Sequence, residues 1–75
     1  MDTGYYIQDG EIFGPKGSTR SWVEGNHVYS SPGGYTQCWI EEDGRIFSAR
    51  GGDTGFSVRE GRICGPCRRL PWMGK

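Results

Sequence analysis

The sequence predicts an all-β domain built from four β-hairpins, because one short phrase is repeated four times along the chain. Each copy places an aromatic–aliphatic–polar stretch before a Gly-containing turn and a polar–aliphatic–aromatic stretch after it, which is the pattern of a tight hairpin. The second aliphatic position of each copy recurs after 16, 18 and 17 residues, at Ile12, Val28, Ile46 and Ile63. No stretch carries an apolar stripe at helical spacing, so the repeat of about 17 residues is the organising unit.

The chain has 75 residues, 33% of them hydrophobic, and 14 glycines. This length fits a single domain over residues 1–75 with a small core, for which oligomerisation is a common support. We predict hairpin repeats at about residues 5–13, 21–29, 38–47 and 56–64, followed by a C-terminal tail at residues 68–75.

The hairpin register sorts the side chains onto two faces. Pairing across the first turn puts Ile7 opposite Ile12 and Tyr6 opposite Phe13, so the aliphatic pair shares one face and the aromatic pair the other. Because an isolated hairpin is marginal in water, we expect the four to pack pseudo-symmetrically around a common axis as a small rosette or closed β structure. The predicted core is the eight aliphatics Ile7, Ile12, Val23, Val28, Ile40, Ile46, Val58 and Ile63.

The copies differ in two places. The third carries one extra residue, which predicts a three-residue turn that keeps Ile40 and Ile46 in phase. The fourth has Ser57 and Cys64 where the others have two aromatics. The apolar segment 70–73 is expected to cover this gap, either within the chain or on a neighbouring subunit.

Charge is sorted by position although the formal net charge is zero. The hairpins hold seven acidic and three basic side chains, whereas the connections and tail hold six basic side chains and one acidic, Asp53. We therefore expect an acidic rim formed by the turns and a separate basic region. Basic side chains beside Gly33–Gly34 and Gly51–Gly52 favour a small anion, since consecutive backbone amides can cradle one. The alternative is that short loops are Gly-rich for conformational reasons alone.

Candidate ligand-binding residues follow from this distribution. One Arg on a phosphate and one aromatic stacked on a base would suffice for a single nucleotide, whereas duplex nucleic acid needs many cationic contacts. The alternative for the aromatics is ordinary packing in a small core or an oligomer interface. The candidates are Lys16, Arg20, Arg50, Arg68, Arg69, Trp22, Tyr35 and Trp39.

The cysteines and the single histidine admit a metal or redox site. Cys64 and Cys67 have the spacing of a redox dithiol, but no βαβ pattern surrounds them. With Cys38 and His27 they could supply four zinc ligands, although only one close-spaced pair is present. Ordinary satisfied or exposed side chains are the default, and no cofactor is expected. The chain shows no signal-peptide or membrane-span pattern, so we expect reduced thiols and a cytoplasmic location.

An enzyme is not expected. His27 is the only imidazole, and the serines occupy turn or strand contexts without the elbow that exposes a nucleophile. The acidic turn at residues 41–43 could support metal-assisted chemistry, but a solvated surface charge cluster is the favoured explanation.

The fourfold phrase, with Gly14-Pro15 and Gly65-Pro66 directly after two copies, resembles the small bacterial and phage domains called the 4-fold β-flower. The resemblance covers about residues 4–67 and implies four petals around a pseudo-fourfold axis in a protein of bacterial or phage origin. It implies no activity that can be transferred residue by residue.

These observations together predict a non-enzymatic module, expected to form a homo-oligomer, that binds or sequesters a small anionic, nucleotide-type signal. The alternative is a protein–protein module, structural in a phage, that uses exposed aromatics and the tail segment 70–73. A zinc or redox role of Cys64 and Cys67 is the third possibility. Neither duplex nucleic acid nor a membrane is an expected partner.

Overall fold

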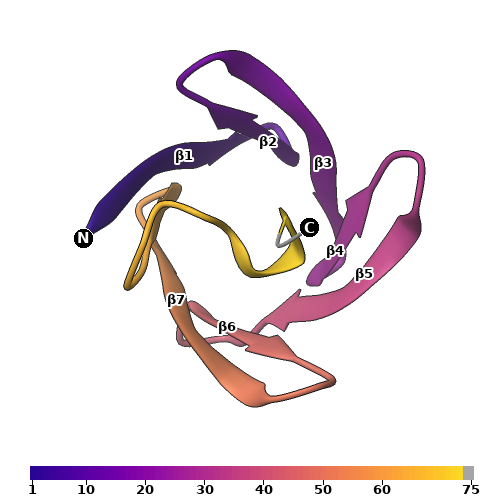
Figure 1. The fold of residues 1–75 in the computed structure, drawn as a ribbon, viewed down its shortest axis with the longest axis vertical. Helices are drawn as coiled ribbons and strands as arrows, with labels where there is room; N and C mark the ends of the chain where they lie inside the picture. The colour runs from indigo at the N-terminus through magenta and orange to yellow at the C-terminus, as the bar shows by residue number, and fades with distance from the viewer. Residues whose placement is uncertain (74–75) are drawn as a thin grey trace.

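A computed structural model describes residues 1–73 and shows a closed antiparallel barrel of eight strands (Figure 1). The strands are β1 (Asp2–Gln8), β2 (Glu11–Gly14), β3 (Gly17–Glu24), β4 (His27–Ser30), β5 (Gly34–Ile40), β6 (Arg45–Ser48), β7 (Gly52–Arg59) and β8 (Arg62–Cys64). One 3-10 turn, η1 (Pro71–Met73), ends the described chain. The predicted tail extends to residue 75, and its last two residues lie outside the described part. None of the helical structure in residues 1–73 is long and apolar enough to cross a membrane.

Strand order in the barrel follows chain order, and β1 pairs with β8 to close it. In this topology the tight turns within the four hairpins lie at one end, which we call the turn end. The β2–β3, β4–β5 and β6–β7 connections lie at the other end, the connection end. Figure 1 shows these three connections extending outward from the barrel, with the tail crossing the centre of the view.

The predicted hairpin register is confirmed. Ile7 pairs with Ile12, and the same aliphatic pairing recurs in the other three hairpins. Asp9 and Gly10 both have positive φ, at 53° and 82°, as a primed two-residue turn requires. In the third hairpin the amide of Glu41 donates to the carbonyl of Arg45 at 2.8 Å. That bond closes the expected three-residue turn and leaves Ile40 opposite Ile46.

The core is only half of the predicted aliphatic set. Ile12, Val28, Ile46 and Ile63 are completely buried, but their partners on the first strand of each hairpin are only half-buried. The predicted core is therefore confirmed in full for one member of each pair, whereas Ile7, Val23, Ile40 and Val58 are only partly buried and pack against it. The missing interior is supplied by three residues that the repeat did not mark, Cys38, Phe56 and Leu70.

Four threonines fasten the hairpins to one another. Each lies at the register shift where two neighbouring hairpins pair, and its hydroxyl donates to a carbonyl of the neighbouring hairpin at 2.6–2.7 Å. The same hydroxyl accepts from the amide two residues later, at 3.2–3.3 Å. The intervening residue has positive φ in every case, which is the geometry of a β-bulge. These joint threonines are Thr3, Thr19, Thr36 and Thr54.

The residue two positions after each joint threonine points into the barrel near the connection end. There it lies opposite a residue on the other side of the same hairpin. We call these the mouth pairs. Ser21/Ser30 and Cys38/Ser48, in the second and third hairpins, are paired in the strand register, and Tyr5/Gly14 and Phe56/Gly65, in the first and fourth, are in side-chain contact. A Cβ added to Gly14 would lie 2.6 Å from the Tyr5 ring, and one added to Gly65 would overlap the Phe56 ring. The first and fourth pairs are thus an aromatic over a glycine, whereas the second and third are two small polar side chains.

The tail lies within the chain, over the small mouth pairs. Leu70 is completely buried in the cluster that contains Cys38, and η1 contacts β5. The expectation that segment 70–73 covers Ser57 and Cys64 on the fourth hairpin was wrong. The tail instead fills space inside the barrel, which the small mouth pairs leave open. It does not cover the outer face of the fourth hairpin, where the two aromatics are missing.

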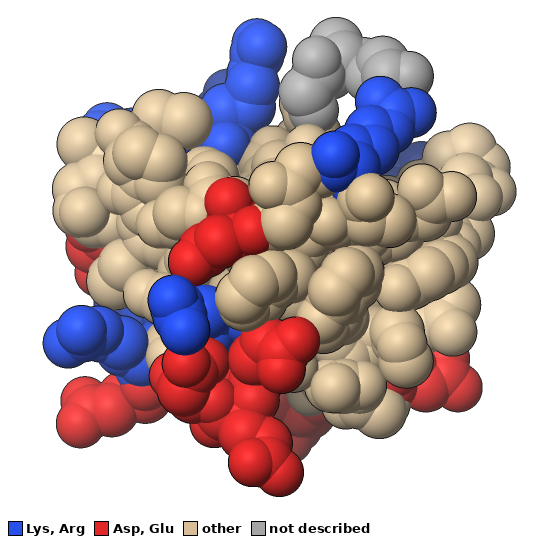
Figure 2. All heavy atoms as spheres, turned by 90° about the horizontal axis from the view of Figure 1, so that it is seen from below, with Lys and Arg blue, Asp and Glu red and all other residues tan. Residues whose placement is uncertain are grey.

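The charge separation follows from the topology. Because the hairpin turns share the turn end, their carboxylates collect there, and Figure 2 shows most of the visible acidic side chains at the lower end of the molecule. Basic side chains stand at the opposite end, and others lie beside the acidic group. The sequence predicted an acidic rim at the periphery of a rosette. In the structure the acidic side chains instead collect at one end of a barrel, the turn end.

Candidate functional site

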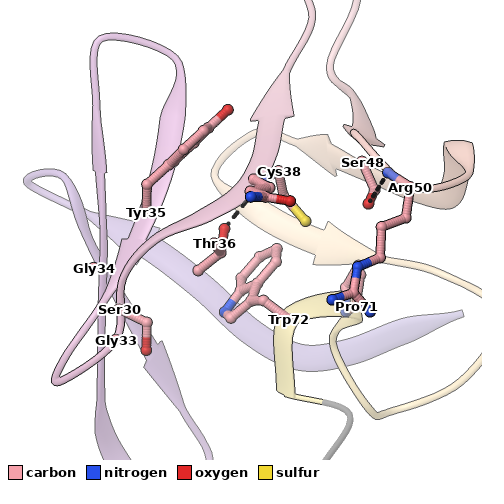
Figure 3. A pocket seen from close by; sticks show the side chains of 11 residues that line it. Ser30, Gly33, Gly34, Tyr35, Thr36, Cys38, Ser48, Arg50, Pro71 and Trp72 are labelled. Carbon is pink, nitrogen blue, oxygen red and sulfur yellow. Dashed lines mark hydrogen bonds between the residues drawn. The ribbon is translucent and has the colours of Figure 1, made fainter.

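The candidate site is a hollow of about 510 Å³ at the connection end, beside the tail (Figure 3). The β4–β5 connection, β5, the end of β6 and η1 enclose it. We call it the Arg50 hollow; its lining is Ser30, Gly33, Gly34, Tyr35, Thr36, Gln37, Cys38, Ser48, Arg50, Pro71 and Trp72. It occupies the half of the mouth where the mouth pairs are small.

Arg50 gives the hollow its charge. The residue follows β6, and its amide donates to the Ser48 hydroxyl at 3.2 Å. Among residues 1–73, no carboxylate lines the hollow and no acidic side chain forms an ion pair with Arg50. A guanidinium in a concave site without a counter-charge makes the site electropositive.

Two other hollows differ in this respect. One, of about 320 Å³, contains Arg62 and Arg68 together with Asp2, which accepts from Arg62 at 2.7 Å. The other, of about 250 Å³, contains Arg45 between Asp43 and Asp53. Each of these hollows also holds a second arginine, Arg68 and Arg59 respectively, for which no ion pair is found in the described chain. Both nevertheless contain carboxylates that would repel an anion, whereas the Arg50 hollow has none among its described lining residues, so the Arg50 hollow is the better anion site.

Trp72 brings an unpaired donor to the hollow. Its indole Nε1 is buried and has no hydrogen-bond acceptor among the described residues. In Figure 3 the ring lies in the hollow close to Thr36 and Cys38, with its nitrogen turned toward Ser30 and Gly33 and with Arg50 on the opposite side. A buried donor without a partner costs free energy, so this nitrogen marks a place where an acceptor would be stabilising.

Cys38 is not suited to act as a nucleophile. Burial raises the pKa of the Cys38 thiol, and hydrogen bonding with Thr36 and Ser48 only partly offsets this effect. The thiol therefore stays protonated at neutral pH, and a neutral thiol is a poor nucleophile and metal ligand. Its contribution to the hollow is its small volume.

The structure brings together only part of the predicted ligand set. Arg50 and Tyr35 both line the hollow, but the Tyr35 ring packs 5.4 Å from Tyr29 and 5.2 Å from His27, and in Figure 3 it points away from Trp72. Tyr35 therefore cannot stack on a ligand held by Arg50 in this arrangement. Trp72, which was not among the predicted ligand-binding residues, is the aromatic that lies there.

The other predicted ligand residues lie outside the Arg50 hollow. Arg68 lines the second hollow, whereas Lys16, Arg20 and Arg69 are exposed and line none of these three hollows.

Trp22 and Trp39 belong to the outer wall of the barrel. Trp22 stacks on Tyr29 and Trp39 on Phe47, with centroid distances of 5.9 and 6.2 Å. Their indole nitrogens donate to Glu24 and Glu41, respectively. The prediction that either tryptophan joins a cationic loop at one site was wrong, because the register turns both away from the interior.

The proposed zinc ligands are not assembled. Within residues 1–73, no group of three His, Cys, Asp or Glu side chains has the arrangement of a metal site. Cys38 is buried inside the barrel, Cys64 is half-buried at the end of β8, Cys67 is exposed, and His27 packs on Tyr35 outside. The chain after Cys67 begins no helix before η1, so the strand-to-helix context of a redox dithiol is missing from the described chain.

One signal for the site was present in the sequence. The mouth positions could have been found from the joint threonines, which recur every 16 to 18 residues and each precede a mouth residue by two.

Comparison with protein families, with characterised proteins and with solved structures finds no match for this chain.

Proposed function

We propose that this protein is a non-enzymatic module that binds a small anionic, nucleotide-type ligand in the Arg50 hollow. The observation that carries the proposal is the presence of a guanidinium in the largest of three hollows with no carboxylate among its described lining residues. The remaining polar lining can donate hydrogen bonds, from the hydroxyls of Ser30 and Ser48 and from the indole of Trp72. A site with a surplus of donors favours a ligand rich in acceptors.

The size of the hollow supports a small molecule. Ligand pockets in proteins commonly enclose about 300 to 1,000 Å³, and the volume here is about 510 Å³. Duplex nucleic acid would instead need a broad cationic surface, and the acidic turns occupy one whole end of the barrel. The proposal assigns the ligand to binding or sequestration, because the hollow offers a neutral thiol and no imidazole for proton transfer.

The repeat architecture is part of the same proposal. We interpret the four hairpins as pseudo-symmetric units of a β-flower, related by rotation about the barrel axis. The joint threonines support this interpretation, since each makes the same pair of hydrogen bonds with lengths that agree within 0.1 Å. Variation at the mouth pairs would then have specialised one side of a symmetric scaffold for binding. A bacterial or phage origin, a cytoplasmic location and a homo-oligomeric state belong to this proposal as predictions.

Isothermal titration calorimetry against nucleotides and cyclic dinucleotides tests the proposal. Arg50→Ala should weaken binding by roughly tenfold to a hundredfold, the usual value of a hydrogen bond to a charged group. Arg68→Ala is the matched control, because it removes a cation from the second hollow and should leave the affinity unchanged. Absence of binding across the panel, or equal losses in the two variants, would contradict the proposal.

The second candidate is a protein–protein module, and one observation favours it. Trp22, Tyr29, Tyr35 and His27 form a continuous series of contacting rings on the outer wall, and Tyr35 is 42% exposed. The tail cannot contribute its anchor to such an interface, because Leu70 is completely buried. Light scattering after size-exclusion chromatography, with Tyr35→Ser as the variant, tests this candidate. A monomer that associates with a larger co-purifying protein, and that loses this association on the substitution, would support it, whereas a discrete homo-oligomer would favour ligand binding.

A further inference from the structure

The Arg50 hollow has two recognition points, and they lie on different sides of one aromatic ring. Arg50 stands on one side of Trp72, and the unpartnered Nε1 of Trp72 is turned to the other side, toward Ser30 and Gly33 (Figure 3). A single compact anion at Arg50 would leave the indole donor unpaired. A ligand that pairs both points must carry two separate acceptor groups and extend across the ring.

We propose that the ligand is a planar heterocycle that bears one anionic group, as a nucleoside monophosphate does, and that Trp72 recognises the heterocyclic ring. The anionic group pairs with Arg50, a ring acceptor accepts from Trp72 Nε1, and the flat part lies against the indole. This inference rests on the proposed function and adds to it the ligand class and the residue that distinguishes one ring from another.

The charge of the lining limits the number of anionic groups. Arg50 is the only cationic side chain among the described lining residues, and it matches one phosphate. Burying a second phosphate without a counter-charge would be costly. The indole, by contrast, is a neutral donor on an aromatic face, which is suited to the ring nitrogen or carbonyl of a base.

The tryptophans of the chain provide a matched set of controls. The indole nitrogens of Trp22 and Trp39 donate to carboxylates on the outer wall, at 3.4 and 2.7 Å, whereas Trp72 Nε1 has no acceptor in the described chain. Trp→Phe removes the N–H and retains an aromatic ring. The three substitutions therefore compare a donor that the ligand needs with two that it does not.

The experiment is calorimetric titration of wild-type protein, Trp72→Phe, Trp22→Phe and Trp39→Phe with the four ribonucleoside 5′-monophosphates and with ribose 5-phosphate. At least one monophosphate should bind wild type more tightly than ribose 5-phosphate does. Trp72→Phe should weaken that monophosphate about tenfold, the value of one ordinary hydrogen bond, and leave ribose 5-phosphate unchanged. The other two variants should bind like wild type.

Stability gives a second readout that a purely structural role would not produce. Removing an unsatisfied buried donor should offset the packing lost with the smaller ring, so the melting temperature of ligand-free Trp72→Phe should stay close to that of wild type. Weaker binding together with nearly unchanged stability is the expected combination. A lower melting temperature with unchanged affinity would show that Trp72 only packs, and would overturn the inference.

The outcomes separate this inference from the proposed function. If ribose 5-phosphate binds in an Arg50-dependent way and no nucleoside monophosphate binds better, the anion site stands and the reading of a ring by Trp72 is wrong. If Trp72→Phe weakens ribose 5-phosphate as much as it weakens the nucleotide, the indole contacts the anion and the two-point arrangement is wrong. If no probe binds wild-type protein, both proposals fail.

Discussion

The two halves of the barrel mouth are built on the same backbone and have opposite character. At Tyr5/Gly14 and Phe56/Gly65, an aromatic ring lies against a glycine that has no room for a Cβ. At Ser21/Ser30 and Cys38/Ser48, small side chains face one another. The first half is filled by its own hairpins, whereas the second half receives Leu70 and opens into the Arg50 hollow. The side-chain volumes of the mouth pair thus decide whether a repeat closes its part of the mouth or leaves it open to the tail and the hollow.

The largest expected effect concerns the residue that fills the small half. Leu70→Ala should lower the free energy of unfolding by about 2 to 5 kcal/mol, because it removes a completely buried side chain and leaves a cavity. Urea denaturation followed by circular dichroism measures the change. Glu11→Ala, at an exposed position, is the control and should alter stability by no more than about 0.5 kcal/mol. A loss below about 1 kcal/mol for Leu70→Ala would show that the tail is not part of the core.

The second effect contrasts the two kinds of mouth pair. Gly65→Ala should destabilise the protein by about 1 to 3 kcal/mol, since the added methyl overlaps the Phe56 ring and overpacks the interior. Ser30→Ala, at the corresponding position in the small half, should cost less than about 1 kcal/mol because its contact with Ser21 is a weak 3.4 Å hydrogen bond. Thermal melts of the two variants provide the comparison. Equal losses would mean that the halves do not differ in packing.

The third effect tests what the two halves share. Thr36→Val and Thr54→Val should each lower stability by about 1 to 2 kcal/mol, because each leaves a carbonyl and an amide without the bridging hydroxyl. Since Thr36 belongs to the small half and Thr54 to the packed half, the two losses should agree within about 0.5 kcal/mol. Denaturant titrations of both variants check this. A large difference would show that the joints are not equivalent.

The smallest effect depends on pH and concerns the seam between β1 and β8. The Arg62 side chain, assisted by the amide of Gly4, holds the pKa of Asp2 below its ordinary value of 3.8. The unfolded chain therefore takes up the proton first as pH falls, so this pair stabilises the fold above that range and the stabilisation is lost in acid. Asp2→Asn should be slightly less stable than wild type near pH 6, and the difference should vanish at about pH 2.

The control for this prediction is Asp9→Asn, whose carboxylate lies at a tight turn at the far end of the barrel. The free energy of unfolding of both variants, measured across the acidic pH range, tests the assigned ion pair. A difference between wild type and Asp2→Asn that grows as pH falls would contradict the assigned ion pair.

The fold and the site were predictable to different extents. The hairpin register was readable because period-two alternation and turn chemistry are local, so Ile7 could be paired with Ile12 from the letters alone. The sequence also placed Arg50 in a basic, Gly-rich connection, and the structure puts it in the lining of the hollow. Trp72 was not predicted to line the hollow because its position depends on where a tail without repeat pattern comes to lie. Tyr35 was assigned to the site although strand pairing turns its ring toward Tyr29 and His27.

The sequence by itself determined four hairpins, their register and the separation of acidic turns from basic connections, since each depends on residues within about ten positions of one another. Only the tertiary structure decided which aliphatics reach the axis, which half of the mouth stays open and where Trp72 rests. These outcomes depend on the volumes of side chains that meet across strands, such as Phe56 over Gly65 and Cys38 beside Ser48. Because protein interiors are close-packed, the space available to a side chain is set by its neighbours in the fold, and these neighbours are not adjacent in the chain.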